Sequence, residues 1–74
     1  MSRLPQISGM ECVKALQRAG YEVRRQKGSH IILTRQDPYR LVSVPNHKTL
    51  KSGTLRAIIS QAGLTVEEFL DLLS

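Results

Sequence analysis

The feature that most constrains the fold of this chain is a connection of only two residues, Gly28-Ser29, between two runs of strand-forming residues. The run before it, Tyr21–Lys27, alternates apolar and polar side chains, and the run after it, His30–Arg35, is rich in β-branched and aliphatic residues. A connection this short can join only antiparallel neighbours. A second short turn at residues 36–39 leads into a third run, Arg40–Val44. The sequence therefore predicts a meander of three antiparallel strands.

The side chains of each predicted strand divide between two faces, because successive side chains along a strand point in opposite directions. In the first strand, Tyr21 and Val23 are expected to share one face. The opposite, polar face of that strand is predicted to carry Glu22, Arg24 and Gln26. In the second strand, Ile31 and Leu33 are expected to pack under the helices, which leaves His30 on the uncovered face, across from the basic residues of the first strand.

Two capping boxes predict where helices begin. In the pairs Ser8/Glu11 and Thr65/Glu68, the hydroxyl and the carboxylate can each accept a hydrogen bond from the other residue's exposed backbone N–H group. Apolar residues at helical spacing follow both pairs. The first pair predicts a helix over Gly9–Ala19, and the second predicts a short C-terminal helix.

The predicted elements follow the order α-β-β-β-α-α. A polar, basic loop at Asn46–Gly53 follows the third strand, and the stripe of a second long helix comes after it: Leu55, Ile58, Ile59 and Ala62. The simplest fold that buries these stripes is an α+β fold in which the helices pack on one face of a three-stranded antiparallel sheet. At 74 residues, we expect one domain over residues 1–74. The first five elements, α-β-β-β-α, follow the order of double-stranded RNA-binding domains.

The composition narrows the possible functions. No apolar run approaches the roughly 18 residues that a membrane span needs, and the first residues lack the apolar core of a signal peptide, so we expect a cytoplasmic protein without a membrane partner. The single cysteine, Cys12, forms no internal disulfide. Cys12, His30 and His47 contain no closely spaced ligand pair, so we expect neither a metal site nor a cofactor.

The positive charge of the chain is concentrated in its central part. The formal net charge is +5, and ten of the 11 Lys and Arg residues lie between Lys14 and Arg56, where only two residues are acidic. Such a surface attracts polyanions through long-range steering and counterion release. Scattered surface charges often serve solubility alone, but this concentration favours a nucleic-acid partner.

His30 stands out because it lies where a turn becomes a buried strand, close to basic residues. A neutral imidazole at this place can accept a proton from a ribose 2′-hydroxyl, which then attacks the adjacent phosphate. Positioned acid–base catalysis of this kind is typically worth about 10²- to 10⁴-fold in rate. Lys27, Lys48 or backbone N–H groups would then stabilise the charge that develops on the phosphate. The other interpretation of His30 is a structural residue that makes one hydrogen bond beside the turn.

The chain resembles the HicA family of toxin ribonucleases over nearly its whole length. LPQISGMECVKALQRAGYEV resembles the first helix and strand of the family, and RQKGSHIIL resembles its signature, in which a glycine, a small residue and a histidine follow a basic stretch. VPNHKTLKSGTLRAIISQAGLTVEEFL resembles the second signature and the C-terminal helices. Two such motifs in this order and at this spacing are specific.

The resemblance implies a fold like that of a double-stranded RNA-binding domain, an endoribonuclease that cuts mRNA and other RNA, and a HicB-type antitoxin that covers and neutralises the toxin. The family's catalytic histidine maps onto His30, with Gly28 and Ser29 shaping the turn that presents it. His47 matches a recurrent histidine of the later loop, with a role in binding substrate or in structure.

We therefore expect the toxin of a type II toxin–antitoxin system, a metal-independent mRNA interferase with His30 as general base or proton shuttle. RNA contacts are predicted at Lys27, Gly28, Ser29, His47, Lys48 and Lys51. Two alternatives remain open at this point. One is a non-catalytic RNA-binding module of the double-stranded RNA-binding type, and the other is a domain whose basic face binds an acidic protein.

Overall fold

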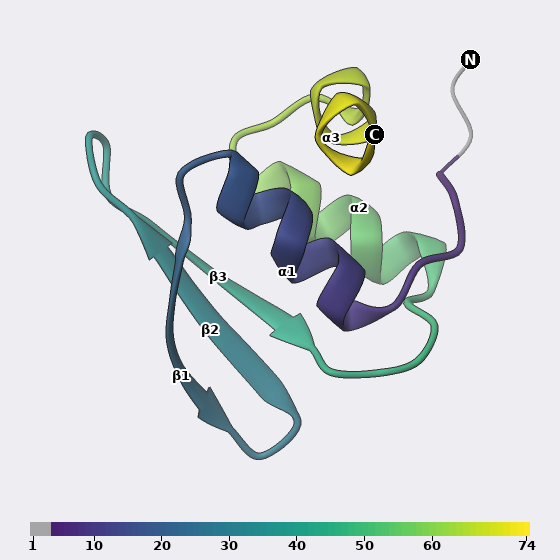
Figure 1. Cartoon of the computed structure of the whole chain (residues 1–74), viewed down its shortest axis with the longest axis horizontal. Helices are drawn as coiled ribbons and strands as arrows, with labels where there is room; N and C mark the ends of the chain where they lie inside the picture. The colour runs from purple at the N-terminus through teal and green to yellow at the C-terminus, as the bar shows by residue number, and fades with distance from the viewer. Residues whose placement is uncertain (1–3) are drawn as a thin grey trace.

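The computed structural model describes residues 4–74, so residues 1–3 of the predicted domain lie outside the described part (Figure 1). The elements are α1 Gly9–Arg18, β1 Glu22–Lys27, β2 His30–Arg35, β3 Arg40–Pro45, α2 Ser52–Gln61 and α3 Val66–Leu73. Their order confirms the predicted α-β-β-β-α-α succession, of which the first five elements follow the order of double-stranded RNA-binding domains. Within residues 4–74, every helix is too short or too polar to cross a membrane.

The three strands form one antiparallel sheet in the order β1-β2-β3, with β2 in the middle (Figure 1). Helices α1 and α2 cover one face of this sheet, and α3 packs on both of these helices. The strand residues beneath the helices are buried: Ile31, Leu33, Val42 and Val44. They meet helix residues that are buried as well, among them Leu16, Leu55 and Phe69. The prediction of an α+β fold with helices on one face of the sheet is confirmed.

The caps of α1 and α3 form as the sequence predicts. Ser8 and Glu11 exchange hydrogen bonds of 2.9 and 3.1 Å between side chain and backbone, and Thr65 and Glu68 do the same at 2.8 and 3.1 Å. Helix α2 differs from both, because its N-cap residue, Lys51, makes no side-chain capping hydrogen bond. Helix α2 also begins before Gly53, where the sequence predicted loop.

Tyr21 and Val23, which were expected to share one face, differ strongly in burial, although Val23 lies opposite Leu33 and therefore on the side of the sheet that the helices cover. The Tyr21 side chain is 2 % exposed and its hydroxyl donates a hydrogen bond to the Ala62 carbonyl oxygen, whereas Val23 is 44 % exposed. The backbone N–H of Tyr21 is bonded to Leu16 in α1, so the chain enters β1 from beneath that helix. β1 is an edge strand, and all six of its residues, Val23 included, are exposed.

Candidate functional site

The face of the sheet that the helices leave uncovered, here called the open face, is defined by the pairing of the strands. Residues directly opposite one another in antiparallel strands point to the same side of a sheet. Three such rows include the open-face residues of β2: Lys27–His30–Pro45, Arg25–Ile32–Ser43 and Glu22–Thr34–Leu41. His30 therefore lies at one end of the open face, beside a lysine, as predicted.

A β-bulge in β1 increases the positive charge of this face. The register of β1 against β2 shifts between Val23 and Arg25, so that Arg24 is an extra residue. The Arg24 Nε donates a 2.8 Å hydrogen bond to the Thr34 hydroxyl, and Arg25 lies opposite Ile32. Two consecutive arginines thus belong to the open face.

The bulge corrects the simple alternation predicted for β1. Gln26 was expected on the polar face with Arg24, but it lies opposite Ile31, which belongs to the covered face. Lys27 consequently comes opposite His30. The alternation of apolar and polar residues carries no signal for an inserted residue, so Arg25 was missed as a member of the site.

His30 is exposed and is the first residue of β2. The turn before it contains Gly28 with a φ of 60°, a backbone conformation that glycine adopts without steric cost, and the Gln26 side-chain amide donates a 3.1 Å hydrogen bond to the Gly28 carbonyl oxygen. Among residues 4–74, the His30 imidazole has no hydrogen-bond or ion-pair partner. The ring is therefore accessible to a ligand that docks on the open face.

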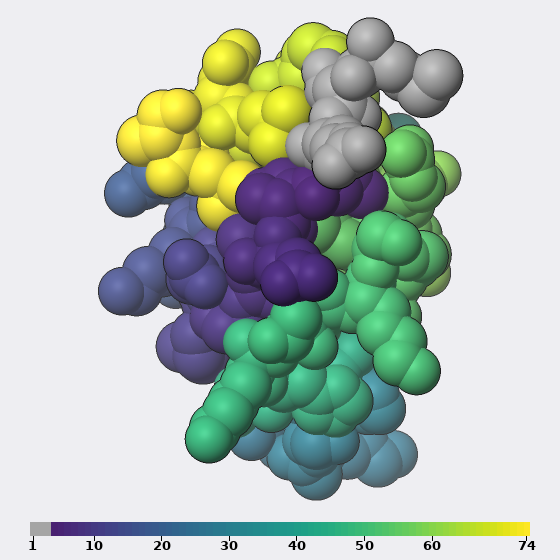
Figure 2. All heavy atoms as spheres, turned by 90° about the vertical axis from the view of Figure 1, so that its right-hand side faces the viewer, coloured from purple at the N-terminus to yellow at the C-terminus, as the bar shows by residue number. Residues whose placement is uncertain are grey.

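The loop between β3 and α2 is attached to the His30 end of the sheet by backbone hydrogen bonds. The Asn46 N–H donates to the Ser29 carbonyl oxygen at 2.6 Å, and the Gly9 N–H donates to the His47 carbonyl oxygen at 2.8 Å. In Figure 2 this teal-green loop lies between the purple start of α1 and the blue hairpin below it. A Cβ atom on Gly9 would overlap the carbonyl oxygen of Pro45, so the close approach of α1 to the loop requires glycine at position 9.

The predicted site residues are thus partly brought together. Lys27, Gly28 and Ser29 adjoin His30 directly, and His47 belongs to the attached loop. Lys48 follows His47 in the loop and is exposed, while Lys51 lies farther along, at the N-terminus of α2. The first turn of α2 holds no acidic residue, so its N-terminal N–H groups and Lys51 form a positively polarised end.

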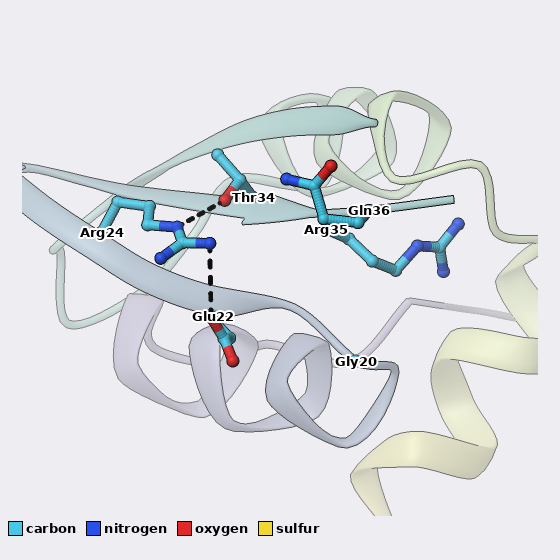
Figure 3. A pocket seen from close by; sticks show the side chains of 6 residues that line it. All are labelled: Gly20, Glu22, Arg24, Thr34, Arg35 and Gln36. Carbon is cyan, nitrogen blue, oxygen red and sulfur yellow. Dashed lines mark hydrogen bonds and ion pairs between the residues drawn. The ribbon is translucent and has the colours of Figure 1, made fainter. Parts of the chain in front are cut away.

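A hollow of about 390 Å³ lies at the opposite end of the hairpin and is distinct from the His30 site (Figure 3). Arg24 spans it, bonded to Thr34 on one side and 3.3 Å from the Glu22 carboxylate on the other. Thr34 is four residues from His30 along β2, which is about 13 Å at the usual rise of a strand. The hollow has no histidine in its lining, and Glu22 offsets part of the positive charge of Arg24.

Cys12 takes no part in the site. Its side chain is fully buried in the core, and this burial raises the pKa of the Cys12 thiol to about 12. A neutral, inaccessible thiol is neither a nucleophile nor a metal ligand. Within the described residues, no three His, Cys, Asp or Glu side chains are grouped so that they could hold a metal ion.

The comparison with protein families agrees with the sequence motifs. A model of the HicA toxins of bacterial toxin–antitoxin systems matches residues 9–64, and a search of curated proteins found no significant match. The matched span covers most of the chain, from the first residue of α1 to the end of the turn after α2, and includes both the His30 hairpin and the His47 loop. The chain therefore belongs to the HicA toxin family of bacterial toxin–antitoxin systems.

Proposed function

We propose that this toxin is an endoribonuclease that cleaves mRNA without a metal ion and uses His30 as the general base. The observation that carries the proposal is the exposed His30 imidazole, which has no partner among residues 4–74 and lies directly opposite Lys27 on the open face. Membership of a toxin family supports a growth-arresting activity. The basic open face supports a polyanionic substrate.

In the proposed reaction, His30 accepts the proton of a ribose 2′-hydroxyl while that oxygen attacks the adjacent phosphorus atom. The bond between phosphorus and the 5′-oxygen of the next nucleotide breaks. The products are a 2′,3′-cyclic phosphate and a 5′-hydroxyl end. Lys27 is positioned to stabilise the charge on the phosphate oxygens, because its strand position is paired with that of His30.

The binding of the RNA strand is assigned to cations around this centre. Arg25 shares the open face with His30, and Lys48 extends the positive charge along the attached loop. Lys51 and the uncapped N-terminus of α2 offer a second place for a phosphate group. Gly28 and Ser29 act through the shape of the turn. These contacts predict that RNA affinity falls steeply as salt is added.

Toxins of this class act together with an antitoxin, and we propose that the partner here is of the HicB type. It neutralises the toxin by preventing RNA from reaching the open face. Expression of this chain alone is then expected to arrest growth, and co-expression of the adjacent antitoxin frame is expected to relieve the arrest. Arrest that persists with the antitoxin present would contradict this pairing.

The replacement His30→Ala tests the catalytic assignment. We expect cleavage of a labelled transcript in EDTA to fall by about 10²- to 10⁴-fold, because the base is removed. Circular dichroism should show an intact fold, since His30 is exposed. The control is Gln36→Ala, which removes an exposed polar side chain just beyond the other end of β2 and should leave cleavage unchanged. Full activity in folded His30→Ala would remove His30 from the mechanism.

The second candidate function is a non-catalytic RNA-binding module. The fold favours it because the first five elements follow the order of double-stranded RNA-binding domains. Incubation with RNA in EDTA distinguishes the two functions. Such a module would bind duplex RNA and leave it intact. Wild-type protein that shifts RNA on a gel without shortening it would favour the module. Cleavage that requires an added divalent metal would contradict the metal-independent mechanism.

A further inference from the structure

We infer that His47 is a second catalytic residue and supplies the proton that the leaving 5′-oxygen takes up. This inference rests on the proposed function, in which His30 is the base. The backbone of Asn46, the residue before His47, joins the loop after β3 to the hairpin that carries His30, and the backbone of His47 joins the same loop to α1.

The position of His47 is fixed from both sides. The residue before it, Asn46, donates its backbone N–H to the Ser29 carbonyl oxygen at 2.6 Å, and Ser29 is the neighbour of His30. The His47 carbonyl oxygen accepts the Gly9 N–H at 2.8 Å, at the start of α1. The loop is therefore held at the hairpin by hydrogen bonds to two different elements.

These contacts limit the distance between the two histidines. His30 and Pro45 are paired across the sheet, where opposite Cα atoms are about 5 Å apart, and His47 follows Pro45 by two residues of about 3.8 Å each. The two histidine Cα atoms are therefore roughly 13 Å apart at most. Two imidazole side chains reaching in from that separation can contact the same phosphodiester group from different sides.

The fold does not require a histidine at position 47. Both anchoring bonds involve backbone atoms of the loop, which any residue would supply. The His47 side chain is exposed and makes no hydrogen bond or ion pair within residues 4–74. A structural role for the imidazole thus has no observed contact to support it, whereas an accessible imidazole near His30 can serve the reaction.

Protonation of the leaving 5′-oxygen calls for a second group, on the side of the phosphorus atom opposite the 2′-oxygen. Attack on phosphorus proceeds with the entering and leaving oxygens roughly in line, on opposite sides of the phosphorus atom. A base beside the 2′-oxygen is therefore poorly placed to protonate the 5′-oxygen. In the balanced step, His30 gains the 2′-hydroxyl proton, protonated His47 gives its proton to the 5′-oxygen, and no other reactant is consumed. Imidazole suits this role because it is the side chain that ordinarily changes charge between about pH 5 and 8.

The test compares two substrates that differ in one atom. One is a short RNA with a single scissile ribonucleotide, and the other has sulfur in place of its leaving 5′-oxygen. A thiolate is a far weaker base than an alkoxide and departs without receiving a proton. The proteins are the wild type, His47→Ala, His30→Ala and the loop control Thr49→Ala, whose exposed side chain has no assigned role.

We expect His47→Ala to cleave the oxygen substrate about 10²- to 10³-fold more slowly than the wild type and to cleave the sulfur substrate at nearly the wild-type rate. His30→Ala should be slow on both substrates, and Thr49→Ala should match the wild type on both. Equal loss on both substrates in His47→Ala, or no loss on either, would overturn the assignment of His47 while leaving that of His30 standing. A wild type that cleaves neither substrate would overturn the proposed function itself and the role of His47 with it.

Discussion

The two faces of the sheet place opposite demands on neighbouring residues of a single strand. On the covered face, Ile31 and Leu33 of β2 are 4 % and 0 % exposed and belong to one core cluster with buried residues of α1 and α2. On the open face, His30 is exposed and Ile32 is only half-buried. Alternate residues of β2 therefore contribute either to stability or to the proposed chemistry, and the consequences of substituting them should be separable.

The separation is not complete, because a backbone hydrogen bond from Gly9, at the start of α1, reaches the loop beside His30. A helix that covers one face thus also positions residues at the edge of the other. The comparison of the two faces predicts that substitutions within the core cost the most stability, that substitutions of exposed open-face side chains mainly change activity, and that substitutions at this junction do both.

The largest loss of stability is expected from Leu33→Ala. Leu33 is fully buried at the centre of the covered face, and removing a buried leucine side chain typically costs about 2–5 kcal/mol. A domain of this size has only about 5–15 kcal/mol to lose. Urea unfolding followed by circular dichroism measures the difference.

The matched control for this experiment is Ile32→Ala, one residue earlier in the same strand. Because Ile32 is only partly buried, its truncation removes less buried surface, and we expect at most about half of the loss seen for Leu33→Ala. Equal losses for the two variants would show that the open face is as much a part of the core as the covered face, and the comparison would then fail.

The next largest effect is expected at the junction, from Gly9→Ala. The added methyl group would overlap the Pro45 carbonyl oxygen, so α1 and the loop must move apart. Overpacking of this kind costs about 1–3 kcal/mol. Because His47 is anchored to Gly9, RNA cleavage by the variant should fall even at temperatures where it remains folded.

Gly53→Ala is the matched control for Gly9→Ala. A Cβ atom at Gly53 would meet nothing within 4 Å, and alanine is favoured over glycine inside a helix by up to about 1 kcal/mol. We expect this variant to be as stable as the wild type or slightly more so. If Gly9→Ala behaved in the same way, the close contact between α1 and the loop would not matter to the fold.

The sequence predicted most of the covered face and its helices because the signals there are local. The two residues of each capping box, Ser8/Glu11 and Thr65/Glu68, are three positions apart, and both capping boxes form as expected. The burial of Ile31 and Leu33 followed from simple alternation. Such features depend on contacts within one turn of a helix or one strand.

The open face was harder to predict because it depends on pairing between distant segments. The bulge at Arg24 places Arg25 opposite Ile32 and Lys27 opposite His30. The residue types in β1 do not indicate that the strand contains an extra residue. Val23 is exposed although it lies opposite the buried Leu33, because it belongs to the edge strand, and the position of a strand in the sheet is not a local feature of the sequence. The link between His47 and Gly9 joins residues 38 positions apart and passes through backbone atoms, which carry no sequence signal.

The smallest effect, when it is measured per pH unit, is the response of stability to alkaline pH through Cys12, which lies on the covered side. Burial raises the pKa of the Cys12 thiol from 9.0 to about 12, so the folded protein keeps this proton at pH values where the unfolded chain loses it. The unfolded state then binds fewer protons, and the free energy of unfolding falls as the pH rises. The contribution is complete below about pH 9 and is lost progressively up to about pH 12, with a slope of at most about 1.4 kcal/mol per pH unit.

Urea unfolding of the wild type and of Cys12→Ala between pH 8 and pH 10.5 isolates this effect, because every other titrating group is common to both proteins. We expect the wild type to lose stability more steeply than Cys12→Ala above pH 9, by about 1 kcal/mol per pH unit. The comparison uses the slopes, so the constant cost of truncating the buried side chain does not enter. Parallel pH profiles for the two proteins would mean that water reaches the thiol, and that the covered side is less completely closed than its packing indicates.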